Sequence, residues 1–148
     1  MSNPVHLTRP ALKLTHDGAL YVLAKAIEAA QSLAVPQCIA IVDEGCNLLS
    51  FVRMDGSRVL SIESATRKAM TSAATGLASG TLPSEKALHL AEATSGRMTN
   101  LPGGLPLIVE GHVVGGIGVG SGTGEQDLEV ARAAVEAFEH YLAGRHTS

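Results

Sequence analysis

Six glycines lie close together in the segment GGIGVGSGTGEQD, which starts at Gly115 of the 148-residue chain. Glycine permits backbone conformations with positive φ and lets a ligand or another backbone approach closely. The segment is expected to begin as a strand and to end at a helix, whose first N–H groups favour anions. It predicts either a site for a small carboxylate or phosphate near Ser121–Glu125, or a glycine-rich strand packed under a helix. Its candidate ligand-binding residues are Gly118, Ser121 and Gly122.

A second group of candidate residues combines two cations with a carboxylate. Arg53 and Asp55 are expected where a strand ends, and Lys68 on the following helix, beside the apolar residues Ala65 and Ala69. A cation that borders an apolar stripe needs an ion partner or an exit to solvent. The group therefore predicts either a cationic pocket for a substrate carboxylate or a snorkelling lysine with a surface ion pair.

Two acidic residues, Glu125 and Asp127, are expected in the first turn of the last helix. Acidic side chains stabilise a helix N-terminus by about 0.3–1 kcal/mol each, which accounts for them without chemistry. The alternative is that they carry protons for a reaction, as Asp55 could. Together with Lys68, these three carboxylates form the candidate catalytic set.

Composition and charge exclude several classes of partner. The net charge is −3, aromatic residues make up only 3% of the chain and Trp is absent, which argues against nucleic acid. No apolar run reaches the roughly 18 residues that a membrane helix needs, and the N-terminus has no apolar signal core. We therefore expect a cytoplasmic protein whose two cysteines are free thiols.

The six histidines show no paired metal-ligand spacing, so the sequence predicts no metal site. An imidazole can ligate haem iron, and that role stays open for each of them.

Periodicity predicts one α/β domain over residues 1–148, with an irregular arm at 1–14 and an antiparallel sheet covered by helices. Pairs of short apolar runs separated by Asp, Glu, Gly and Asn indicate two hairpins. Thr15 is the expected N-cap of the first helix and Ser84 that of the third. The apolar stripe of the second helix is expected to run from Ile62 to Leu77. The predicted helices are 16–34, 59–77, 85–95 and 125–142, and the predicted strands are 38–42, 48–53, 107–109 and 113–119.

Three stretches together resemble the GlcG/HbpS family of haem-degrading proteins, formerly DUF336. They are CIAIVDEGCNLLSFVRMDGS, ESATRKAMTSA and GGLPLIVEGHVVGGIGVGSGTGEQDLEVARAAVEAF. The resemblance covers about residues 11–142. The motif positions that it carries over are Arg53, Asp55, Lys68, Gly104, Gly118, Glu125 and Asp127, which adds Gly104 to the candidate ligand-binding residues.

The resemblance implies a profilin-like, three-layer fold with a sheet of about five strands, one of them near Gly96–Asn100. It also implies an oligomer of identical subunits that binds a small molecule, with haem as a possible cofactor. Three functions stay open: action on a small anionic metabolite of a catabolic pathway, haem or corrinoid binding, and a non-catalytic accessory subunit.

Overall fold

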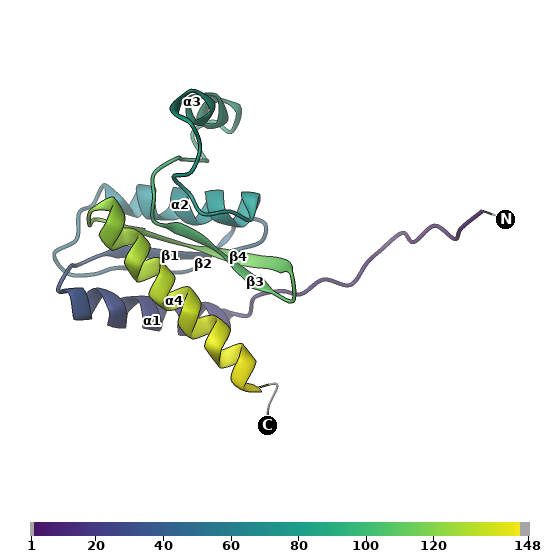
Figure 1. Cartoon of the computed structure of the whole chain (residues 1–148), viewed down its shortest axis with the longest axis horizontal. Coiled ribbons are helices and arrows are strands. Elements are labelled where there is room, and N and C mark those ends of the chain that lie inside the picture. Colours follow the sequence, from purple (N-terminus) through teal and green to yellow (C-terminus); the bar gives the residue numbers. More distant parts are fainter. Residues whose placement is uncertain (1, 146–148) are drawn as a thin grey trace.

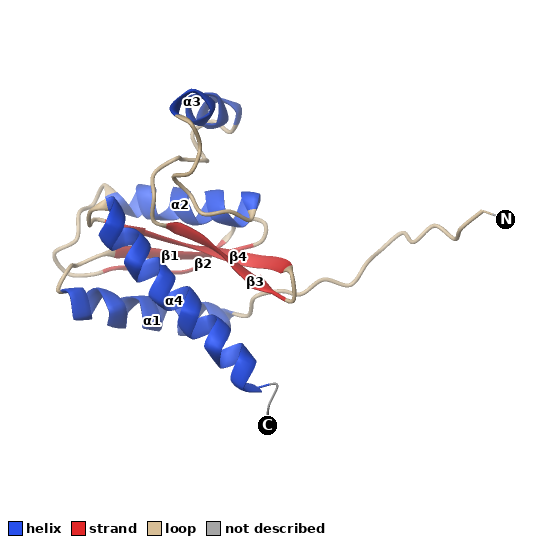
Figure 2. Ribbon diagram, viewed as in Figure 1, coloured by secondary structure: helices blue, strands red, loops and turns tan. Residues whose placement is uncertain are grey.

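The computed structural model describes residues 2–145, which form a three-layer α/β structure (Figures 1 and 2). A four-stranded antiparallel sheet with the order β2-β1-β4-β3 is the middle layer. Helices α1 and α4 cover one face, and α2 covers the other. The elements are α1 (His16–Leu33), β1 (Cys38–Asp43), β2 (Leu48–Arg53), α2 (Ser61–Thr75), α3 (Ser84–Ala93), β3 (Gly104–Val109), β4 (His112–Gly120) and α4 (Gly124–Arg145).

The predicted fold class and element order are confirmed, but the expected number of strands is too high. The segment Gly96–Asn100, near which a fifth strand was expected, forms no strand. It belongs to a loop that returns from α3, in which Thr99 donates its backbone N–H to Thr71 Oγ1 at 2.9 Å. The sheet therefore ends at β3, where Pro106 lacks the N–H that a further strand would need on its outer side.

The ends of the helices follow local chemistry. Thr15 caps α1 as predicted, with its hydroxyl accepting from the Gly18 N–H at 2.9 Å. Ser84 is not a cap, because α3 already begins at this residue and Pro83 holds the capping position without a side-chain bond. The predicted stripe of α2 is also too long, since Ile62 is 36% exposed and Leu77 is 61% exposed. Leu77 lies beyond the end of α2, and Ile62 faces away from the sheet, because its neighbour Ser61 is the residue buried there, against Gly120 of β4.

Two apolar clusters hold the layers together. The larger one, which includes Ile39, Ile41, Ile117 and Phe138, fills the space between the sheet and helices α1 and α4. The smaller one packs α2 on the other face and consists mainly of small side chains such as Ala65 and Ala69. Glycine allows this close packing: a Cβ on Gly118 would lie 1.9 Å from the Ala65 carbonyl oxygen.

Cys38 and Cys46 are free, as expected. Among the described residues, no helix has the length and apolar character that crossing a bilayer requires.

Candidate functional site

A polar cleft of about 310 Å³ opens where the start of α2 meets the loop between β4 and α4. Leu101 and Pro102, from the loop that precedes β3, form a third wall. Helices α2 and α4 cover opposite faces of the sheet. The cleft lies where their N-terminal ends meet, beyond the last residue of β4. Its polar lining residues are Arg58, Ser61, Ser64, Lys68, Ser121 and Asp127.

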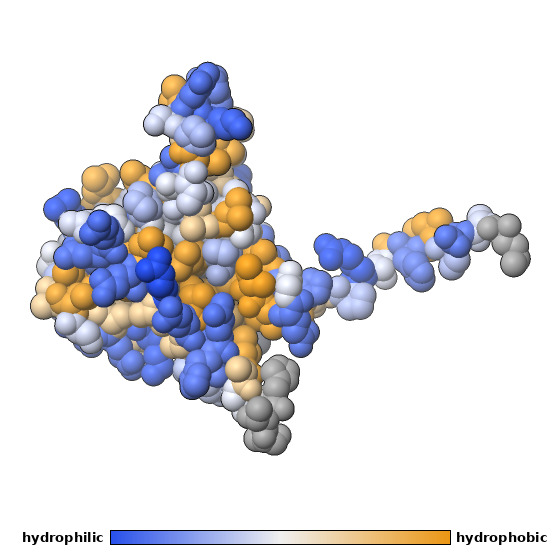
Figure 3. All heavy atoms as spheres, in the orientation of Figure 1, coloured by the Kyte–Doolittle hydropathy of each residue, from blue (hydrophilic) through white to orange (hydrophobic). Residues whose placement is uncertain are grey.

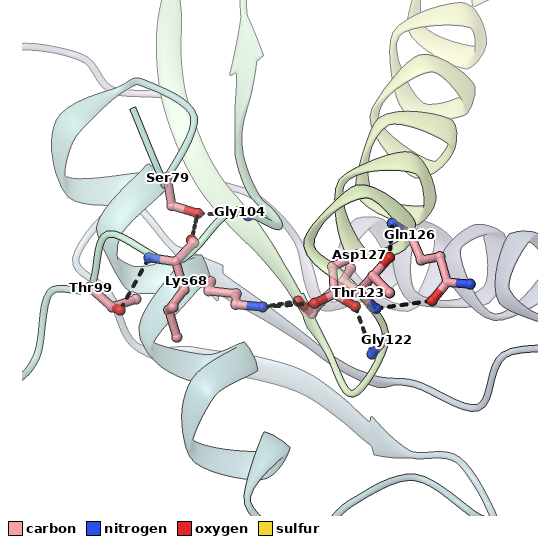
Figure 4. A network of polar contacts seen from close by, with 10 residues as sticks. Lys68, Ser79, Thr99, Gly104, Gly122, Thr123, Gln126 and Asp127 are labelled. Carbon is pink, nitrogen blue, oxygen red and sulfur yellow. Dashed lines mark hydrogen bonds and ion pairs between the residues drawn. The ribbon is translucent and has the colours of Figure 1, made fainter. Parts of the chain in front are cut away.

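A buried ion pair forms the floor of this cleft (Figure 4). Lys68 Nζ lies 3.0 Å from Asp127 Oδ2, and the two side chains are only 5% and 4% exposed. Lys68 Nζ also donates to the Val119 carbonyl oxygen at 2.8 Å. An ammonium group has three N–H donors, and the third has no acceptor among residues 2–145. Because Lys68 lines the cleft, this donor is available to a ligand.

Asp127 is held on its other side as well. Its Oδ1 accepts from the Gly122 N–H at 2.9 Å. The amide nitrogen of Gln37, oriented toward the carboxylate, donates to the same oxygen at 2.9 Å and to the Gly120 carbonyl oxygen at 2.6 Å. A carboxylate with this many donors holds the loop and Lys68 in place.

The start of α4 is closed by a capping box. The Thr123 N–H donates to Gln126 Oε1 at 2.9 Å, and the Gln126 N–H donates to Thr123 Oγ1 at 3.2 Å. These bonds engage the amide of Thr123, while Asp127 engages that of Gly122. Two of the amides expected to bind an anion near Ser121–Glu125 are thus occupied by the chain's own side chains. The amide of Gly124, which also lines the cleft, has no such partner among the described residues.

Three side chains add donors above the ion pair. Ser61 and Ser64 lie seven and four residues before Lys68 on one face of α2, and their hydroxyls bond to no other described residue. The exposed Arg58 precedes this helix, and its backbone N–H is fixed by Ser121 Oγ at 2.9 Å. A hydroxyl pair, a guanidinium and an ammonium together form a donor set suited to a small anion.

The structure separates the predicted site residues into three groups. Lys68, Ser121, Gly122 and Asp127 all line the cleft. Arg53, Asp55 and Glu125 are exposed and lie outside its lining. Gly104 and Gly118 are buried against α2, where added Cβ atoms would lie 2.4 Å from the Lys68 carbonyl oxygen and 1.9 Å from that of Ala65. Their position matches the packing interpretation of the glycines.

Sequence reasoning missed Arg58, Ser61, Ser64 and Gln37. The spacing of Ser61, Ser64 and Lys68 is a helical one and could have revealed the two serines. Gln37 had no such signal, because it precedes β1 and reaches Asp127 only through the tertiary fold.

A second, mainly apolar slot of about 410 Å³ lies between α1, α4 and the β3–β4 hairpin. Figure 3 shows hydrophobic side chains gathered on this side of the molecule, near the base of the N-terminal arm. Tyr21 and Tyr141 line the slot, with ring centroids 5.0 Å apart, and Lys13 and Arg145 bring cations to it. Among the described residues, no group of three or more His, Cys, Asp or Glu side chains could hold a metal ion.

Comparison with known proteins places this fold in a family. The sequence model of the family described as "Haem degrading protein HbpS-like" matches residues 14–136, so the chain belongs to the HbpS-like family. It is 36% identical over 124 residues to the uncharacterized 15.0 kDa protein in the dhaT-dhaS intergenic region of Citrobacter freundii, covering 78% of this chain and 86% of that protein.

Longer relatives contain the same unit as one part. The chain is 33% identical over 138 residues to the corrinoid adenosyltransferase PduO of Salmonella typhimurium, which covers 88% of this chain. It spans only 40% of the length of that enzyme.

Solved structures agree with the assignment. The Klebsiella pneumoniae protein ORFY, of family DUF336, superposes with a TM-score of 0.86 at 26% identity, covering 93% of this chain and 98% of that one. The haem complex of PduOC superposes with a TM-score of 0.78 at 28% identity, covering 85% and 95%.

Proposed function

We propose that the protein binds a small anionic metabolite in the polar cleft above Lys68, within a catabolic pathway. The observation that carries this proposal is the buried Lys68–Asp127 pair, in which Lys68 keeps one N–H donor without an acceptor among residues 2–145, in the lining of a cleft where the hydroxyls of Ser61 and Ser64 also have no described partner. The N-terminal ends of α2 and α4 add partial positive charge at the same place.

The expected roles follow from position. Arg58, at the exposed rim, would contact a carboxylate or phosphate first and through two N–H groups. Ser61 and Ser64 would bond to its remaining oxygens or to a neighbouring hydroxyl. Lys68, at the floor, is the group in reach of a reacting atom and the candidate proton donor if turnover occurs.

The proposal can be tested by titrating ¹⁵N-labelled protein with pyruvate, malonate and inorganic phosphate and following amide shifts. We expect saturable shifts at Ser61, Ser64 and Gly124 with at least one of these anions. Arg58→Ala should weaken binding at least tenfold, while Arg53→Ala is the matched control, because Arg53 is an exposed arginine outside the cleft. Equal effects of the two substitutions, or no saturable shift in this region, would contradict the proposal.

A second candidate function is haem binding in the apolar slot between α1 and α4. It is favoured by the family description and by the relative solved as a haem complex. The slot has mainly apolar walls, and two cations stand at it: Lys13, which pairs with Glu44, and Arg145, which lies over the Tyr141 ring. A propionate would have to compete with these contacts. The lining donors suited to iron are the phenols of Tyr21 and Tyr141. The imidazole of His16 lies outside the lining, exposed at the start of α1 and 3.4 Å from Asp17, and would have to turn toward the slot to serve as a ligand.

Haem would supply its own iron chemistry, and the chain would hold and orient it. Titration with haemin followed by absorbance should show a Soret shift that saturates at a fixed number of haemins per chain. His16→Ala should change the position of the band if this imidazole is the ligand, whereas His89→Ala, on α3 and far from the slot lining, should not. A shift that never saturates would exclude a defined haem site.

A further inference from the structure

The charges that line the polar cleft leave a single positive charge without compensation. The lining contains three charged side chains, those of Arg58, Lys68 and Asp127. Lys68 and Asp127 neutralise each other across 3.0 Å. Arg67, the next cation on α2, pairs with Glu63 at 3.5 Å and lies outside the lining. The cleft therefore offers a ligand the charge of Arg58, which is exposed at the rim and has no ion partner among residues 2–145.

The floor of the cleft is polar but carries no net charge. An oxygen that accepted the remaining N–H of Lys68 would lie about 5 Å from Asp127 Oδ2, because two acceptors of one tetrahedral ammonium are separated by that distance. If this oxygen belonged to a carboxylate, the charge of Asp127 would repel it in a place where little water screens the repulsion. A buried anion without a cation of its own is unfavourable, whereas a carbonyl or hydroxyl oxygen avoids both costs.

The donors between the floor and the rim are neutral as well. The hydroxyls of Ser61 and Ser64 have no described partner and can donate to a charged or an uncharged oxygen. The backbone amides at this end of α2 are already used, since the Ser61 N–H donates to the Arg58 carbonyl oxygen and the Ser64 N–H to that of Leu60. The guanidinium of Arg58 is therefore the group that decides where the charge of a ligand lies.

We propose that the cleft selects a singly charged carboxylate that also carries a neutral oxygen, such as a carbonyl or a hydroxyl, and that it discriminates against dianions. The carboxylate lies at the rim on Arg58, and the neutral oxygen accepts the free N–H of Lys68 at the floor. Asp127 sets this preference, because it holds the charge of Lys68. The inference rests on the proposed binding of an anion in this cleft, and it adds the class of the ligand and the direction in which the ligand lies.

Two ligands of nearly the same size and shape test the selection. Malonate and its monoamide, malonamate, differ by one negative charge in neutral to mildly alkaline buffer. In titrations of ¹⁵N-labelled protein at constant ionic strength, we expect malonamate to bind at least tenfold more tightly than malonate. Equal affinities, or tighter binding of malonate, would overturn the inference and leave anion binding intact. No saturable shift with either ligand would also overturn it, but the proposed function fails only if pyruvate and phosphate do not bind either.

A cation added to the cleft tests the cause of the selection without disturbing the buried pair. Ser64→Lys places this cation on the half-buried face of α2 between rim and floor, and should narrow the preference for malonamate over malonate at least tenfold. Ser32→Lys is the matched control, because it adds the same net charge at an exposed position of α1, on the opposite face of the sheet. An equal narrowing by both substitutions would show that net charge sets the preference, and would overturn the inference.

Discussion

Lys68 of α2 and Asp127 of α4 form an ion pair with a 3.0 Å separation, although their helices cover opposite faces of the sheet. The pair closes the gap beyond the end of β4, where no strand separates the two layers. Bonds from Lys68 to the Val119 carbonyl oxygen and from Gly122 to Asp127 connect it to the β4–α4 loop. The residues that position the cleft are therefore the same ones that join the two layers.

Breaking this pair should destabilise the protein more than removing both charges. Lys68→Met leaves the buried carboxylate of Asp127 without its cation, and Asp127→Asn leaves the buried ammonium of Lys68 without its anion. Either change should cost about 3–5 kcal/mol of unfolding free energy. The double variant Lys68→Met/Asp127→Asn should lose less than the two single variants combined. Urea unfolding of the four proteins gives the coupling energy directly.

A surface pair of the same helix is the control for this experiment. Glu63 and Arg67 lie 3.5 Å apart on α2, with side chains that are 72% and 36% exposed. Glu63→Gln should change the unfolding free energy by no more than about 0.5 kcal/mol. If Lys68→Met cost no more than Glu63→Gln, the buried pair would not be the connection between layers described above.

The order of elements was predictable because it depends on local signals. The apolar repeat of α1, its Thr15 cap and the turn chemistry of the first hairpin all act within a few residues. The errors arose where tertiary context decides. Ile62 was assigned to the buried stripe of α2, but its neighbour Ser61 is the residue that packs on the sheet, and Leu77 lies beyond the helix. The segment near Asn100 folds into the loop that returns from α3 instead of adding a strand.

The candidate site was half predictable for the same reason. Lys68 was identifiable because a cation beside an apolar stripe needs a partner, but its partner, Asp127, is 59 residues away and no local pattern joins them. Arg53 was the predicted anchor, but it lies outside the cleft, and it is Arg58, five residues further along the chain, that the fold places in the cleft lining. Glycine motifs were ambiguous, since close packing and ligand approach make the same demand on the backbone.

Gly118 should tolerate no side chain. A Cβ there would lie 1.9 Å from the Ala65 carbonyl oxygen and 2.5 Å from the Ala69 amide nitrogen, so α2 would have to move away from β4. We expect Gly118→Ala to cost roughly 3 kcal/mol or more, because backbone on both sides must shift. Gly144→Ala is the control: an added Cβ at this helical position meets no described atom within 4 Å beyond its chain neighbours and the backbone of its own helix, and alanine favours helix. Thermal unfolding of both variants is the check: Gly118→Ala should lower the melting temperature, and Gly144→Ala should leave it unchanged or raise it.

The capping box at Thr123 should support both the stability of α4 and the shape of the cleft. Thr123→Ala removes the acceptor of the Gln126 N–H and should cost about 1 kcal/mol. Thr123→Ser keeps the hydroxyl and should retain most of this stability. Amide hydrogen exchange at residues 124–127 measures the effect locally, and equal exchange in the alanine and serine variants would contradict a capping role.

Asp43 should make the stability of the first hairpin depend on pH. Burial alone would raise the pKa of this carboxyl, but hydrogen bonds from Asn47 and from the Gly45 N–H outweigh burial and lower the pKa below its ordinary value. A carboxyl whose pKa is lower in the folded state stabilises that state above the unfolded pKa, roughly pH 4, and the gain is lost as the pH falls through the folded pKa.

Asp43→Asn should therefore unfold more easily than the wild-type protein at neutral pH, by about 1 kcal/mol, and the difference should shrink toward zero in acid. Urea unfolding at a series of pH values between neutral and strongly acidic conditions measures this directly. Asn47→Ala is the companion variant, because it removes the side-chain donor at 3.1 Å but leaves the carboxylate in place. Its pH dependence should be weaker than that of the wild type but not abolished, since the backbone donors of Gly45 and residue 47 remain. A constant difference between Asp43→Asn and wild type at all pH values would show that the turn is stabilised by shape and not by the carboxylate charge.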